Sequence, residues 1–156
     1  MLVANFQNIA HNYGIYQVLR NVNATISSGQ KIGLIGANVS YGWSPRAHLP
    51  ALLALPDLEL AAVCTSHADT ARESAARFGA PMAFDNHLEM LARADLDVVG
   101  ISVRVPLHHR LTMDVLEAGK HVYTEWPLGR TTAEAEELAT LARAKGVQTA
   151  AGLQSR

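Results

Sequence analysis

From residue 31 onward, short apolar runs alternate with longer stretches in which apolar residues recur at helical spacing. The apolar runs predict buried strands at residues 32–36, 58–64, 97–103, 121–124 and 147–152, with a further short strand at 82–84. The stretches between them predict helices near residues 46–55, 68–78, 86–93, 107–118 and 132–145. This alternation predicts an α/β fold with a doubly wound, mostly parallel sheet over residues 31–156.

Residues that start and stop helices fit the same division. Thr131 followed by Glu134 forms a capping-box pattern ahead of the last predicted helix. Gly119 and Gly146 stand where helices commonly end. Pro50 falls within the first predicted helix, and proline is comfortable only in a first helical turn. We therefore expect that helix to start late or to kink.

Residues 2–30 have a different texture, rich in Asn, Gln, Ser and β-branched side chains. They predict antiparallel strands attached to an edge of the sheet, with a turn at Gly29, or else a poorly ordered segment. Exposed strands of this kind favour pairing between chains, so self-association through them is expected. The predicted organisation is a β segment over residues 1–30 followed by a second domain over residues 31–156.

Composition narrows the class of protein. Formal net charge is −1 and no basic stripe is present, which argues against a nucleic-acid partner. No apolar run has the ~20 residues that a membrane helix needs. The lone Cys64 excludes an internal disulfide and fits a reducing, cytoplasmic environment. The histidines show no metal-binding spacing, so no metal site is predicted.

A glycine-containing loop follows the first predicted strand directly and contains Gly36, Asn38, Gly42 and Trp43. Glycines there allow backbone N–H groups to approach a phosphate, and the next helix N-terminus favours negative charge. Asn38 stands in place of a second glycine and tolerates positive φ. The loop fails as a Walker A motif, since its glycines are too far apart and Trp43 occupies the lysine position. The alternative is a simple strand-to-helix turn.

The second predicted strand ends at Thr65 and Ser66, where a dinucleotide site often carries a carboxylate for the ribose. Small hydroxyls there, with Arg72 on the next helix, would accept a 2′-phosphate. Ser66 followed by Asp69 also reads as a helix cap, and capping does not exclude ligand contact. The predicted cofactor is therefore NAD or NADP, with the choice open.

Glu125, Trp126 and Pro127 directly follow the predicted strand at residues 121–124. A carboxylate and a rigid turn at a strand tip lie where α/β sheets bind ligands. The bond between Trp126 and Pro127 is a candidate for the cis form, which occurs almost only before proline.

These features resemble the N-terminal Rossmann domain of the Gfo/Idh/MocA oxidoreductases. The likeness covers residue 31 to the end. It rests on the segments at 31–36, 46–51 and 58–64 and, most specifically, on 118–127. The closing residues 146–156, with Gly42 and Trp43, are similar to the branch that includes the fungal galactose-regulon repressor.

The resemblance implies cofactor contacts for Glu125 and Pro127, with Trp126 in place of the family lysine that serves substrate and nicotinamide. An indole cannot replace an ammonium in proton transfer, so that role does not carry over. The resemblance also places His108 at a family histidine position, while the alternative is a histidine on the helix surface. We further expect Val103, at the end of the third predicted strand, to contact the cofactor.

Members of this family continue with a substrate domain that supplies further catalytic residues. Because the chain ends at Arg156, near the end of the last predicted strand, we expect a cofactor domain without its substrate domain. No catalytic residue is predicted, and the chain alone is expected not to be an active oxidoreductase. A non-catalytic sensor is the related alternative.

Residues 2–38 resemble something else, the beginning of an ABC-type ATPase domain. That likeness implies an aromatic contact with adenine near Tyr13, although a packed strand aromatic is the preferred interpretation. The two resemblances overlap at residues 31–38, which predicts a fusion, or a chimeric or designed P-loop/Rossmann hybrid. An ATP-binding module without hydrolysis is the remaining alternative.

Overall fold

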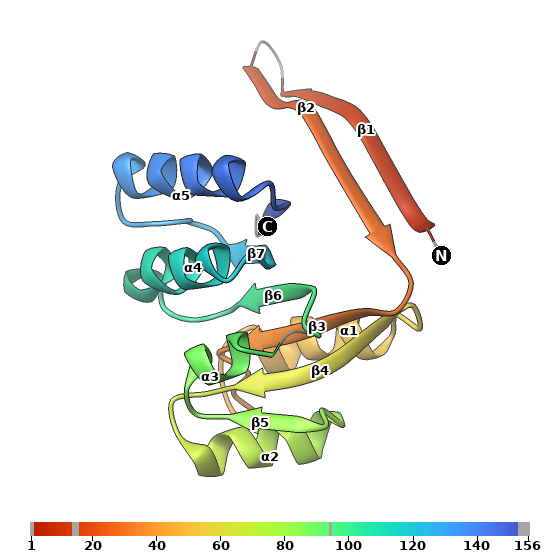
Figure 1. Cartoon of the computed structure of the whole chain (residues 1–156), viewed down its shortest axis with the longest axis vertical. Helices are drawn as coiled ribbons and strands as arrows, with labels where there is room; N and C mark the ends of the chain where they lie inside the picture. Colours follow the sequence, from red (N-terminus) through yellow and green to blue (C-terminus); the bar gives the residue numbers. More distant parts are fainter. Residues whose placement is uncertain (1, 14–15, 94, 153–156) are drawn as a thin grey trace.

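A computed structural model of the chain describes residues 2–13, 16–93 and 95–152, with side chains from residue 27 onward (Figure 1). Its main sheet has six strands in the order β5-β4-β3-β6-β7-β8, and all neighbouring pairs run parallel. The strands are β3 (Gln30–Ile35), β4 (Leu58–Cys64), β5 (Met82–Phe84), β6 (Val98–Ile101), β7 (His121–Glu125) and β8 (Thr149–Gly152). The predicted doubly wound Rossmann-like sheet is confirmed.

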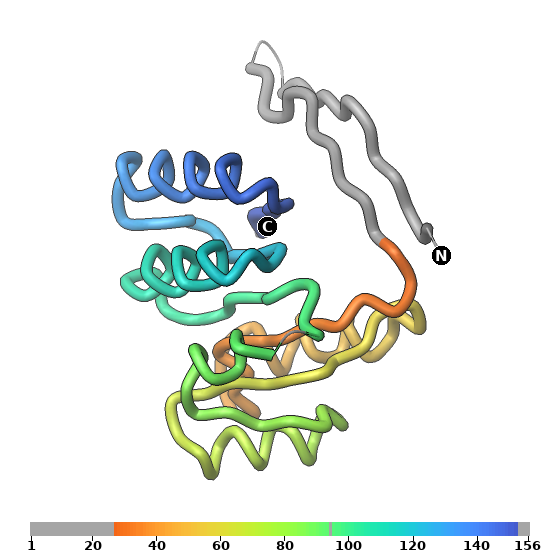
Figure 2. The backbone as a smooth tube through the Cα atoms, viewed as in Figure 1, coloured from red at the N-terminus to blue at the C-terminus, as the bar shows by residue number. Residues whose placement is uncertain are grey.

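Helices connect successive strands as the alternation predicts, and Figure 2 traces this path from residue 27 onward. They are the π-helical turn η1 (Ser44–His48), α1 (Leu49–Leu53), α2 (Ala68–Phe78), α3 (His87–Leu91), the 3-10 turn η2 (Val105–Leu107), α4 (His108–Glu117) and α5 (Thr132–Lys145). The first predicted helix is split into η1 and α1. Pro50 lies in the first turn of α1, where its missing N–H costs no hydrogen bond, as expected.

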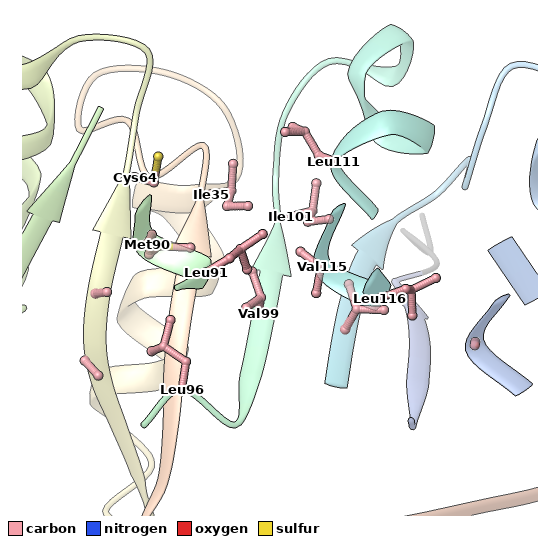
Figure 3. Packing of buried hydrophobic residues seen from close by; sticks show 14 of the residues in the cluster. Ile35, Cys64, Met90, Leu91, Leu96, Val99, Ile101, Leu111, Val115 and Leu116 are labelled. Carbon is pink, nitrogen blue, oxygen red and sulfur yellow. The ribbon is translucent and has the colours of Figure 1, made fainter. Parts of the chain in front are cut away.

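The hydrophobic core forms one layer on each face of the sheet. One cluster packs α3, α4 and α5 against it through residues such as Met90, Leu111 and Val115 (Figure 3). The other packs α1 and α2 on the opposite face through Leu49 and Phe78. With both faces covered, the central strands read as continuous apolar runs rather than as alternating patterns.

The N-terminal strands pair with each other. β1 (Leu2–Tyr13) and β2 (Tyr16–Ser27) are antiparallel, as expected, and form a two-stranded sheet of their own. Over the described residues they share no strand pairing with the main sheet, so the predicted attachment to its edge is wrong. The turn at Gly29 is present, with φ of 79°, and the Gly29 N–H donates to the Asp57 carbonyl over 2.8 Å.

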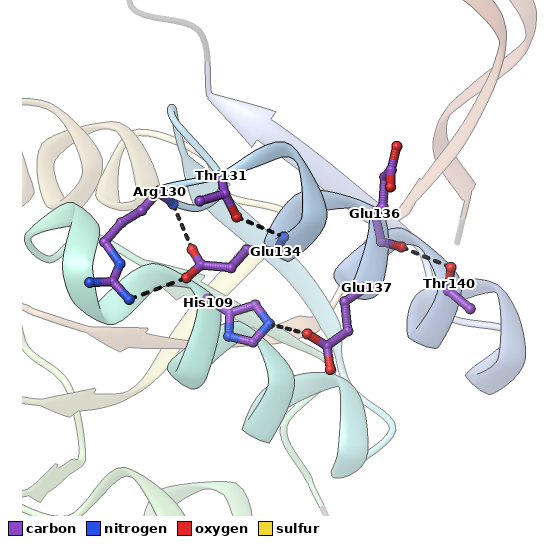
Figure 4. Close-up of polar contacts among 7 residues, drawn as sticks. All are labelled: His109, Arg130, Thr131, Glu134, Glu136, Glu137 and Thr140. Atoms are coloured by element: carbon purple, nitrogen blue, oxygen red, sulfur yellow. Dashed lines mark hydrogen bonds and ion pairs between the residues drawn. The ribbon is translucent and has the colours of Figure 1, made fainter.

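The start of α5 shows the predicted cap in an altered form (Figure 4). The Thr131 hydroxyl accepts the Glu134 N–H over 3.2 Å, as a capping box requires. The Glu134 carboxylate, however, accepts the N–H of Arg130 over 2.6 Å, one residue before the position that the motif predicts. That backbone hydrogen bond, and then the Arg130 charge, lower the pKa of Glu134.

Candidate functional site

A cleft of about 650 Å³ opens at the carboxyl ends of β3, β4, β6 and β7. It lies at the boundary between β3 and β6, from which the chain winds toward opposite edges of the sheet. Parallel α/β sheets bind ligands at such switch points. Most predicted cofactor residues line this cleft, namely Gly36, Asn38, Gly42, Trp43, Thr65, Ser66, Val103 and Glu125.

The loop after β3 is held in shape mainly by its own polar groups. The Asn38 side-chain oxygen accepts the N–H groups of Ser40 and Tyr41 over 2.7 and 3.2 Å. The Ser44 hydroxyl donates to the Gly36 carbonyl over 2.7 Å, which ties the start of η1 to the end of β3. Asn38 therefore acts as an internal brace for the loop as well as a residue of the cleft.

Gly36 is required for a reason other than ligand approach. Its φ is +86°, and a Cβ there would lie 2.0 Å from the Ser102 carbonyl oxygen. Its N–H also donates to the Cys64 carbonyl over 2.8 Å, so this group is already satisfied. Gly36 allows β3, β4 and β6 to converge at the base of the cleft.

The end of β4 is organised by Thr65 rather than by Ser66. The helix cap of α2 is His67, and no side chain caps its N-terminus, so the predicted Ser66 cap is wrong. The Thr65 hydroxyl instead donates to the His67 carbonyl over 2.9 Å and lies 2.6 Å from the Thr70 hydroxyl. Ser66 is exposed and lines the cleft, and its hydroxyl does not cap α2.

Glu125, at the end of β7, is 7% exposed and lines the cleft. Its carboxylate lies 2.6 Å from the His48 Nε2 atom of η1, and the His48 ring packs edge-on against Tyr123 at 5.6 Å between ring centroids. Burial and then the nearby Glu125 charge raise the pKa of Tyr123. The carboxylate is thus held in place by an imidazole that the sequence alone did not identify.

His108 lies beneath the surface, with 1% exposure, so the surface-histidine alternative is wrong. Its Nδ1 atom is 2.7 Å from the Pro127 carbonyl and its Nε2 atom is 2.9 Å from the Val103 carbonyl. The ring therefore joins the loops that follow β6 and β7. His108 and Pro127 are outside the cleft lining.

Trp126 is 59% exposed beside Glu125 and is likewise outside the cleft lining. The bond between Trp126 and Pro127 is cis, as predicted.

The structure adds cleft residues that the sequence analysis missed, among them Tyr41, Asp85, His87, Arg104 and Arg110. Asp85 follows β5 and Arg104 follows β6, so position after a strand was an available signal for both. His87 lies 2.8 Å from Asp114, a partner on another helix that no sequence pattern shows.

Cys64 also lines the cleft, and the residue is only 2% exposed. Burial, and then the Asp85 charge, raise the pKa of this thiol to about 12.

Over the described part of the chain, no group of three or more potential metal ligands comes together, and no helix is long and apolar enough to cross a membrane.

A cleft at the switch point of a parallel sheet, with a glycine loop on one side, defines a dinucleotide-binding domain of the Rossmann type. Residues 30–153 match the family model GFO_IDH_MocA, described as an oxidoreductase family with an NAD-binding Rossmann fold. The chain belongs to this family and is an NAD(P)-binding domain of it.

Relatives of the chain include both dehydrogenases and a regulator. It is 41% identical over 100 residues to dehydrogenase aclE of Aspergillus oryzae, covering 63% of this chain and 27% of that protein. It is 27% identical over 135 residues to the galactose/lactose metabolism regulatory protein GAL80 of Saccharomyces cerevisiae, covering 81% and 31%.

Among solved structures, KijD10, a 3-ketoreductase from Actinomadura kijaniata in complex with NADP and TDP-benzene, superposes with a TM-score of 0.73 at 32% identity. That match covers 79% of this chain and 37% of KijD10. The chain thus spans about a third of the length of the relatives it matches.

Proposed function

We propose that the chain binds NAD or NADP across the cleft, with the pyrophosphate over residues 36–43 and the start of η1. The adenosine ribose would lie beside Thr65 and Ser66, and the nicotinamide near Glu125 and Trp126. Two features support this placement. The cleft is at the switch point of the sheet, and it contains residues from each of the strand ends involved.

The observation that carries the second half of the proposal is the environment of Glu125. Its carboxylate is paired with His48 at 2.6 Å, and the next residue is the exposed Trp126, where the family pattern has lysine. Hydride transfer needs the substrate carbon in near-attack geometry and a proton-transfer group of suitable pKa. We therefore infer that this chain alone holds the cofactor without turning over a sugar or polyol.

Trp126 and Pro127 would then take no part in proton transfer. Trp126 would instead provide an apolar face beside the nicotinamide. His108 would act through the Val103 and Pro127 carbonyls, by fixing the two loops that border the nicotinamide end. Charged residues of the cleft would set the choice between NAD and NADP. Asp85 would favour NAD by accepting hydrogen bonds from the ribose hydroxyls, whereas Arg104 and Arg110 would favour the 2′-phosphate of NADP. All three line the cleft.

Further parts of the proposal rest on the sequence. The net charge of −1 argues against nucleic acid as a partner, and the lone Cys64 favours a cytoplasmic location. Self-association would use β1 and β2.

The ATPase-like and chimeric interpretations of residues 2–38 have no support from the family match, which begins at residue 30. The titration described next includes ATP, the ligand that the ATPase-like interpretation predicts.

Calorimetric titration with NAD⁺, NADH, NADP⁺, NADPH and ATP tests the binding site. Tyr41 lines the cleft and is 65% exposed, so Tyr41→Glu places a carboxylate beside the pyrophosphate without disturbing the core. We expect it to weaken dinucleotide binding about tenfold or more through charge repulsion. Leu53→Glu is the matched control, because Leu53 is 57% exposed on α1 and outside the cleft lining.

Incubation with oxidised cofactor and a panel of sugars and polyols tests the absence of turnover, read from absorbance of the reduced nicotinamide. We expect none above the background without protein. Turnover that Glu125→Ala abolishes would restore an enzymatic function to the isolated chain. Preferential binding of ATP, or equal effects of Tyr41→Glu and Leu53→Glu, would contradict the proposed site.

A further inference from the structure

The contact between His48 and Glu125 joins a cleft-lining carboxylate to a group whose charge changes with pH. Glu125 lines the cleft, whereas His48 contacts it and is outside the lining. Their side chains are 10% and 21% exposed, so the pair is largely shielded from bulk water. Histidine is the side chain that ordinarily changes charge between about pH 5 and pH 8. The pair is neutral when the imidazole is protonated and carries one negative charge when it is not.

We infer that His48 determines which oxidation state of the nicotinamide the cleft prefers, an inference that rests on the cofactor placement proposed above. The oxidised nicotinamide ring carries a positive charge and the reduced ring carries none, while the rest of the molecule is the same. A negative His48–Glu125 pair therefore attracts only the oxidised ring, and a neutral pair distinguishes the two weakly. Protonation of His48 shifts the preference toward the reduced cofactor.

Other charged groups near His48 do not reproduce this effect. Tyr123 packs against the ring, but burial and Glu125 raise its pKa, so it stays neutral in this range. Arg46 lies on the same turn and keeps its charge throughout. Neither changes charge when the imidazole does.

Across the cleft, Asp85 follows β5 and His87 begins α3, on the side of the sheet where β4 and β5 lie. β3 and β6 separate β4 from the β7 strand that carries Glu125. That side would face the adenosine half, which both oxidation states share. Charge changes at His87 therefore act equally on the two affinities and cancel in their ratio.

The experiment measures dissociation constants of the oxidised and reduced cofactor, as NAD⁺ with NADH and as NADP⁺ with NADPH, from about pH 5.5 to about pH 8. We expect the oxidised form to gain about tenfold over the reduced form as the pH rises. His48→Gln keeps a hydrogen-bond donor toward Glu125 but cannot gain charge. Its ratio should stay at the high-pH level throughout, whereas Glu125→Gln, which removes the negative charge, should lower the ratio at high pH to the low-pH level of the parent.

Two histidine variants are matched controls. His109→Gln changes a partly exposed histidine that lies 2.9 Å from Glu137 and is outside the cleft lining. His87→Gln changes a histidine in the cleft lining itself. Both should keep the pH dependence of the ratio.

A second readout needs no variant. By linkage, oxidised cofactor should release more protons on binding than reduced cofactor does within this pH range, as measured by calorimetry in buffers of different ionisation enthalpy. This comparison decides the question even if His48→Gln does not fold.

If both oxidation states bind but their affinity ratio and proton release do not differ with pH, the role of His48 is wrong while the binding site stands. A pH dependence that persists in His48→Gln has the same meaning. If neither oxidation state binds, the proposed function fails and this inference with it.

Discussion

The Ser102 carbonyl oxygen occupies the space that a side chain on Gly36 would need, at 2.0 Å from an ideal Cβ. The backbone at Gly36 also has a φ of +86°, which β-branched residues strongly disfavour. Loss of cofactor binding on substitution here would therefore report on the fold before it reported on the ligand.

Gly36→Val is expected to destabilise the chain by about 3 kcal/mol, from the clash and the strained backbone together. Gly42 has the same φ of +86°, but nothing lies within 4 Å of its Cβ position. Gly42→Ala should therefore cost only about 1 kcal/mol. Chemical denaturation without cofactor measures both changes. Equal stability losses would show that the Ser102 contact is unimportant.

The Cys64 thiol offers a pH-dependent test. Because burial and Asp85 raise its folded-state pKa to about 12, the thiol keeps its proton in the fold well above the pH at which it loses it in the unfolded chain. Its contribution to stability is present below about pH 9 and is lost as the pH rises further. Cys64→Ala should reduce the slope of the melting temperature against pH in that alkaline range.

Alkylation by iodoacetamide gives an independent readout of the same thiol. The native chain should react far more slowly at about pH 8 than the denatured chain, since the thiolate is the reactive form. Rapid labelling of the folded chain would mean that Cys64 is accessible or ionised, contrary to its burial.

The cap of α5 provides an acid-range test. Glu134 has a lowered pKa in the fold, so its carboxylate contributes stability that is present above its ordinary pKa and is lost as the pH falls through the folded value. Glu134→Gln should flatten the fall in melting temperature below about pH 4.5. Thr131→Ala should cost about 1 kcal/mol at neutral pH through loss of the hydroxyl cap. An unchanged acid profile in Glu134→Gln would show that the Arg130 N–H contact does not persist in solution.

The strands and helices of the main sheet follow from sequence because both faces are covered and each boundary has a local cause. Gly146 closes α5 with a φ of 66°, and Pro50 splits the first helix. The sequence did not predict which neighbouring backbone N–H group a capping side chain binds. The Glu134 carboxylate accepts the N–H of Arg130 and not that of Thr131, and Ser66 caps no helix, since local backbone geometry selects among nearby N–H groups.

The candidate site likewise contains residues that the sequence predicted and residues that it did not. Residues at strand ends, such as Thr65 and Glu125, were predicted because parallel strands bring their carboxyl ends to one edge. His48 was missed because its partner Glu125 lies 77 residues away in the sequence. His87 was missed for a similar reason, since its contact with Asp114 depends on how α3 and α4 pack.

The most direct test of the central claim is a crystal structure of the chain grown or soaked with saturating NAD or NADP. We expect the pyrophosphate over residues 36–43, the adenosine ribose beside Thr65 and Ser66, and the nicotinamide ring against Glu125 with His48 still in contact with that carboxylate. A dinucleotide bound elsewhere on the chain, or a cleft that stays empty at concentrations that saturate binding in solution, would contradict the claim.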